Sequence, residues 1–112
     1  MNERRARQRF PIELPIRWRK LRWDIQPGEP QEHHGGRSID ISSYGVHVAF
    51  FGPRPPIHCL IEGFIDWPVA LDGSTALQLR VRGRVVRETP EGFVVEFERH
   101  EFCTKKGTAA VA

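Results

Sequence analysis

The sequence is poor in cysteine and in long apolar runs, and each shortage excludes a class of protein. Cys59 and Cys103 form neither a close pair nor a metal-type spacing, so we expect two free thiols in a reducing compartment. No apolar run approaches the ~20 residues that a membrane-spanning helix needs. The charged N-terminus has no apolar signal region. We therefore expect a cytoplasmic protein without a membrane span.

Helical periodicity is also absent, and apolar residues recur at every second position instead. The alternation is clearest at residues 10–18, 77–85 and 93–97. About six such runs, separated by short turns, predict one all-β domain: a six-stranded antiparallel β-barrel, because closure removes exposed strand edges. The last two strands are expected to form a hairpin. The tail, residues 99–112, is expected to begin as a short helix at most.

Acidic residues are scarce near the N-terminus. Residues 1–22 hold eight Lys or Arg and two Glu, whereas the rest of the chain holds nine basic and twelve acidic side chains. The formal charge is therefore +6 in the first part and −3 in the second. This asymmetry predicts an anionic partner for the N-terminal part.

The basic cluster is RRARQR, residues 4–9. Arg5 and Arg9 are four positions apart, so they lie on the same side of either a helix or a strand. Guanidinium groups offer paired donors that match phosphate oxygens and the O6/N7 edge of guanine, and they stack on bases. Taken alone, however, the cluster is better explained as a solvated basic leader, because basic tracts are common.

A second motif is DISSYG, residues 40–45, between two strand patterns. Asp40 and Ser42 share a face in an extended segment, opposite to Ile39 and Ile41, so we expect both to face solvent. A carboxylate can accept hydrogen bonds from the N1–H and amino group of guanine, and the Ser42 hydroxyl can donate or accept nearby. Gly45 permits a left-handed turn or a close backbone approach. By itself the stretch is an ordinary β-turn sequence.

Together, and in this order, the two motifs resemble the PilZ domain family. The signature of that family is R-x-x-x-R, commonly with a preceding Arg, followed by D/N-x-S-x-x-G. The matching residues are Arg4, Arg5, Arg9, Asp40, Ser42 and Gly45. The late hairpin, VRGRVVRETPEGFVVEFE, is similar to the closing strands of the family. The resemblance covers about residues 3–98.

The resemblance implies a non-catalytic receptor for cyclic di-GMP, a bacterial second messenger that controls motility, biofilm, pilus or exopolysaccharide functions. It implies a flexible arginine segment (1–9), a barrel (10–98) and a tail (99–112). Arg5 and Arg9 would clamp phosphates and guanine edges, and Arg4 would add a contact and favour two bound ligands per chain. Asp40 and Ser42 would read a guanine above the Gly45 turn. The ligand is cyclic di-GMP, with no other cofactor, and a downstream protein partner is expected.

Two other functions stay open. The barrel can serve as an interaction adaptor that uses no nucleotide, or as a basic barrel that binds single-stranded nucleic acid through aromatic stacking. The outward stripe of Arg80, Arg82 and Arg84 serves either solubility or a partner surface. The five histidines lack metal-site spacing, and no nucleophile-elbow pattern indicates a hydrolase. We therefore expect no metal and no enzyme.

Overall fold

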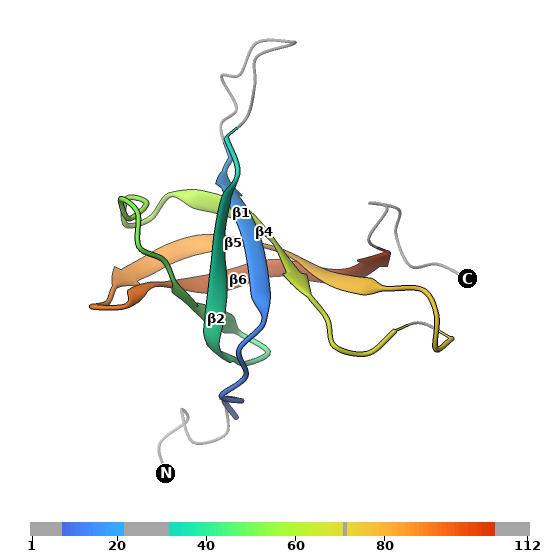
Figure 1. Ribbon diagram of the computed structural model, residues 1–112. Helices are drawn as coiled ribbons and strands as arrows, with labels where there is room; N and C mark the ends of the chain where they lie inside the picture. The colour runs from blue at the N-terminus through green and yellow to red at the C-terminus, as the bar shows by residue number, and fades with distance from the viewer. Residues whose placement is uncertain (1–7, 22–31, 71, 105–112) are drawn as a thin grey trace, which may run out of the picture.

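The computed structural model describes residues 8–21, 32–70 and 72–104. They form six strands and no helix: β1 (Pro15–Lys20), β2 (His34–Ile41), β3 (Gly45–Ala49), β4 (Leu60–Asp66), β5 (Leu77–Glu88) and β6 (Gly92–Thr104). All neighbouring strands are antiparallel and close in the order β1-β2-β3-β6-β5-β4 (Figure 1). The predicted six-stranded barrel is confirmed. The described residues also contain no helix that is long and apolar enough to cross a membrane.

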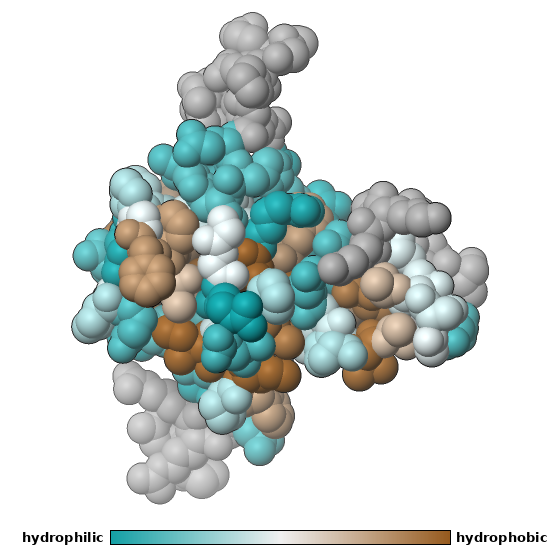
Figure 2. All heavy atoms as spheres, viewed as in Figure 1, coloured by the Kyte–Doolittle hydropathy of each residue, from teal (hydrophilic) through white to brown (hydrophobic). Residues whose placement is uncertain are grey.

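Alternating apolar side chains fill the barrel, as the period of two predicts. Trp18 lies at the centre, 1% exposed, and its ring packs edge-on against those of Phe50 and Phe93. Val81 and Val85 of β5 and Val95 of β6 are fully buried on the same inner surface. Arg80, Arg82 and Arg84 point outward between them. On the face drawn in Figure 2, hydrophilic residues cover most of the surface, interrupted by smaller hydrophobic areas.

The expected C-terminal helix is wrong in its first residues. β6 runs on to Thr104, and its second half stays paired with β5 from Leu77↔Thr104 to Arg82↔Arg99. Pairing with a neighbouring strand satisfies the backbone there, so a helix has no advantage. The resulting β5–β6 hairpin is long and runs across the whole barrel (Figure 1). The rest of the tail, residues 105–112, lies outside the described residues.

The alternating run at residues 10–18 joins the sheet at a later residue than its pattern predicts. β1 begins only at Pro15, and residues 11–14 before it belong to no strand; Pro11 has no N–H to donate to a ladder. The segment is held instead by Ser38 of β2. The buried Ser38 hydroxyl accepts from the Leu14 N–H (2.9 Å) and donates to the Ile12 carbonyl (2.6 Å). This anchor fixes how residues 8–14 approach β2.

Candidate functional site

The segment that carries the basic cluster is joined to the end of β2. Phe10 and Ile41 exchange two backbone hydrogen bonds, Phe10 N–H to Ile41 O (2.8 Å) and Ile41 N–H to Phe10 O (3.0 Å). This isolated antiparallel bridge places Arg9 beside the β2–β3 turn. Two sequence motifs that are about thirty residues apart therefore meet at one point of the surface.

The meeting point is an ion pair between Arg9 and Asp40. Arg9 Nη1 donates to Asp40 Oδ1 at 2.6 Å, with the side chains 48% and 22% exposed. Both groups thus remain accessible from solvent. Of the three predicted arginines, Arg9 is brought to the second motif, whereas Arg4 and Arg5 lie outside the described residues.

The second motif forms the tight connection from β2 to β3. Ser42 N–H donates to the Gly45 carbonyl (2.9 Å), and the Ser42 hydroxyl accepts from the Tyr44 N–H (3.1 Å). Ser42 is buried, 7% exposed, so its predicted solvent-facing position is wrong: the hydroxyl is turned into the connection that it caps. Ser42 therefore shapes the site from beneath, and Asp40 presents the accessible acceptor.

Gly45 is required for packing and not for a left-handed backbone. Its φ is not positive, whereas Gly73, in the turn before β5, has a φ of 74°. A Cβ at Gly45 would overlap the carbonyl oxygen of Val95 on β6. Of the two roles expected for this glycine, the structure thus has the close backbone approach, which lets β3 pair with β6 directly behind the motif.

His47 is a neighbour of Asp40 that the sequence pattern did not single out for the site. It is the cross-strand partner of Asp40, and its Nδ1 lies 3.9 Å from Asp40 Oδ2. On the other side, its Nε2 is 2.9 Å from the Thr89 hydroxyl and 3.8 Å from Glu91. Asp40 is therefore held between a guanidinium and an imidazole, which keeps its carboxyl group in a polar, hydrogen-bonding environment.

Beside Arg9 lies a shallow pocket of about 170 Å³. It brings together the motif and the β5–β6 hairpin, and it is lined by Arg9, Ser42, Tyr44, Gly45, Val86, Arg87, Val94, Val95 and Glu96. Tyr44 is half-exposed there. Arg87 supplies a second cation, for which the described residues contain no carboxylate partner. The pocket thus offers two guanidinium groups, an aromatic ring and the nearby Asp40 acceptor.

Tyr44 and Arg87 were missed for different reasons: Tyr44 lies at an unspecified position within the DISSYG motif, and Arg87 belongs to no spacing motif. Arg87 ends the alternating RVRGRVVRE pattern, where the register between β5 and β6 shifts between Val85 and Arg87. Only the pairing of β3 with β6 brings this end of the hairpin to the β2–β3 turn. The one available signal was an arginine out of phase with the stripe of Arg80, Arg82 and Arg84.

The cysteines and histidines do not form a second chemical site. Cys59 and Cys103 are both free, as predicted, and burial raises the pKa of each thiol above its ordinary value. Raised pKa values favour the protonated thiol at both positions near neutral pH. Across the described residues, no group of three or more His, Cys, Asp or Glu side chains is arranged to hold a metal ion.

Comparison with known proteins gives no match for this chain. No protein-family model matches it, and neither the curated proteins nor the solved structures contain a match. Function is therefore argued from the two motifs and from the geometry of the site.

Proposed function

We propose that this protein is a cytoplasmic, non-catalytic receptor of the PilZ type that binds cyclic di-GMP and changes the surface seen by a downstream protein. The observation that carries the proposal is the Arg9–Asp40 ion pair, because it joins the two motifs of the resemblance at 2.6 Å. A cyclic guanine dinucleotide needs cationic forks for its phosphates and a carboxylate for its guanine N–H groups. Both lie at this one place.

Each side chain has a distinct role in the proposed complex. Arg9 engages a phosphate or the O6/N7 edge of guanine, and Arg87, which lines the same pocket, adds a second cation. Asp40 uses one oxygen for Arg9 and the other, Oδ2, for the N1–H and amino group of a guanine. The half-exposed ring of Tyr44 stacks on a base. Arg4 and Arg5 complete the clamp, as the resemblance implies.

Isothermal titration calorimetry with cyclic di-GMP tests this directly. Arg9→Ala and Asp40→Ala should each weaken binding about 10- to 100-fold, because each removes charge-assisted hydrogen bonds. The matched control is Arg37→Ala. Arg37 is also an exposed arginine in an ion pair, with Glu13 at 2.8 Å, but it lies outside the pocket. It should bind like the wild type.

Three results would contradict the proposal. One is a titration of the wild-type protein, at micromolar concentration, in which cyclic di-GMP produces no heat of binding. Another is binding of cyclic di-AMP as tight as that of cyclic di-GMP, since adenine has no N1–H for Asp40 to accept. The third is salt-sensitive binding of generic single strands that competes with cyclic di-GMP, which would favour the oligonucleotide-binding barrel. A protein partner that binds equally with and without nucleotide, together with a silent titration, would favour the adaptor.

A further inference from the structure

A row of charged side chains crosses four strands on the outside of the barrel. Arg19 of β1 is the register partner of Glu62 of β4, Glu62 is the partner of Arg82 of β5, and Arg82 is the partner of Arg99 of β6. The row therefore contains three cations and one anion. Like charges directly opposite each other on neighbouring strands are destabilising, so the Arg82–Arg99 pair needs an explanation.

Glu62 does not compensate Arg82, although the two are register partners. Its carboxylate, only 6% exposed, accepts from Arg19 Nε and Nη2 at 3.0 and 2.7 Å and from Arg80 Nε at 2.9 Å. Burial alone raises the pKa of this carboxyl group, but the hydrogen bonds from Arg19 and Arg80 outweigh it and hold the pKa below its ordinary value. The carboxylate is thus ionised and fully used by two other arginines.

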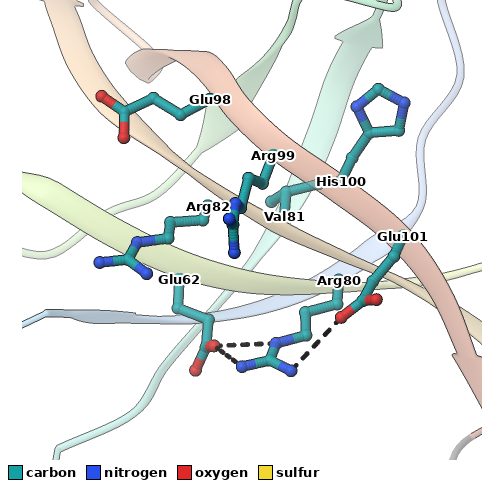
Figure 3. Close-up of a pocket in the computed structure, with 8 residues that line it drawn as sticks. All are labelled: Glu62, Arg80, Val81, Arg82, Glu98, Arg99, His100 and Glu101. Atoms are coloured by element: carbon teal, nitrogen blue, oxygen red, sulfur yellow. Dashed lines mark hydrogen bonds and ion pairs between the residues drawn. The ribbon is translucent and has the colours of Figure 1, made fainter. Parts of the chain in front are cut away.

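The remaining carboxylates beside the row are also occupied. Glu101 lies 3.4 Å from Arg80, and Glu98 lies 3.0 Å from Arg84. Among the residues that the structure describes, Arg82 and Arg99 have no carboxylate partner. Figure 3 shows the same division: dashed lines join Glu62, Arg80 and Glu101, and none reaches Arg82 or Arg99. Three glutamates here therefore pair with three of the five arginines, which leaves Arg82 and Arg99 without a carboxylate.

The two unpaired guanidinium groups line a pocket of about 480 Å³. Arg82 and Arg99 are exposed register partners beside a register shift between β5 and β6. Their long side chains allow two planar forks to reach the oxygens of one tetrahedral dianion, which also balances their two charges. We propose that Arg82 and Arg99 form an oxyanion site for a compact phosphate dianion, separate from the pocket of Arg9 and Asp40.

The surroundings favour a compact phosphate over a nucleic-acid backbone. Glu98 and Glu101 flank the two arginines along β6, and both are about half exposed. An extended polyanion would have to pass these carboxylates, which repel it, whereas a single phosphate is small enough to contact Arg82 and Arg99 while staying farther from the two glutamates. The Glu62–Arg80 network fixes the floor of the site, so a bound anion orders only the two long side chains.

Side-chain ¹⁵N NMR of the arginine Nε–H groups, titrated with inorganic phosphate against potassium chloride of equal ionic strength, tests the site. We expect saturable phosphate shifts at Arg82 and Arg99 that chloride does not reproduce. Arg82→Ala or Arg99→Ala should weaken phosphate binding about tenfold, through loss of charge-assisted bonds. Arg82→Lys should retain part of it, because the charge remains and the fork is lost. Arg37→Ala should bind like the wild type.

The outcomes separate this site from the proposed nucleotide site. Arg9→Ala should leave phosphate binding unchanged, and Arg82→Ala should leave cyclic di-GMP binding unchanged. The proposal is overturned if phosphate and chloride give the same shifts, or if Arg82→Ala and Arg99→Ala bind phosphate like the wild type. It is also overturned if a generic single-stranded oligonucleotide saturates the NMR shifts of Arg82 and Arg99 at a lower concentration than phosphate does. That result would make the surface a nucleic-acid contact.

Discussion

Gly45 belongs both to the proposed ligand-binding motif and to the close packing of β3 against β6. It begins β3, pairs with Glu96 of β6, and leaves no room for a side chain in front of the Val95 carbonyl. The same residue receives the Ser42 N–H hydrogen bond that closes the β2–β3 connection. The position of Asp40 therefore depends on a glycine that allows the close approach of β3 and β6.

Gly45→Ala should destabilise the protein by about 1–3 kcal/mol, because the added methyl group forces β3 away from β6. Urea denaturation measures this. Gly35→Ala in β2 is the matched control, since a Cβ there has no atom within 4 Å, and it should change stability by less than about 0.5 kcal/mol. Equal stability of the two variants would show that the strands separate without cost.

At the scale of strands, Glu62 connects three of them through side chains. It lies on β4 and accepts hydrogen bonds from Arg19 on β1 and Arg80 on β5. Replacing one partner of a buried ion pair leaves the others desolvated and uncompensated, which costs more than losing a surface pair. The outer face of the barrel is therefore braced by charge at this point, above a core that is apolar.

Glu62→Gln should lower the free energy of unfolding at neutral pH by about 3 kcal/mol. The folded-state pKa of Glu62 lies below its ordinary value, so the wild-type advantage is complete above the ordinary carboxyl pKa. It is lost as the pH falls through the lowered folded-state pKa. Chemical denaturation across this pH range measures the difference. Glu98→Gln, at an exposed pair, should cost less than about 1 kcal/mol, and a pH-independent loss in Glu62→Gln would argue against an ionic origin.

The strands also show how much of the structure could be predicted from the sequence. Alternation in β5 predicts its inner and outer faces because that pattern is local. In β2 the expectation that Ile39 and Ile41 share the inner face fails: a register shift between Ser38 and Asp40 buries Ser38 fully. That serine is satisfied by backbone of a distant segment, and no local pattern carries this information. The Arg82–Arg99 pairing depends in the same way on a non-local register.

At the scale of the whole molecule, the candidate nucleotide site exists only when the barrel is closed. Arg9 precedes β1, Asp40 is the last residue but one of β2, and Arg87 is the last residue but one of β5. They become neighbours because Phe10 pairs with Ile41 and β3 pairs with β6. The resemblance carried by the two motifs predicted that Arg9 and Asp40 act together, whereas the contribution of Arg87 follows from the strand topology alone.

A site assembled from three segments binds its ligand only in the folded state, so ligand binding must stabilise the fold. Cyclic di-GMP at a hundred times its dissociation constant should add about 2.7 kcal/mol to the free energy of unfolding. For a domain of this size that corresponds to a rise in Tm of roughly 10 °C. Differential scanning calorimetry measures the shift. Asp40→Ala, with its 10- to 100-fold weaker binding, should show about half of this rise or less at the same nucleotide concentration, whereas Arg37→Ala should respond like the wild type. A rise in Asp40→Ala as large as that of the wild type would place the nucleotide elsewhere on the barrel, because the shift depends on the affinity for the folded state and Asp40 contributes only at this site.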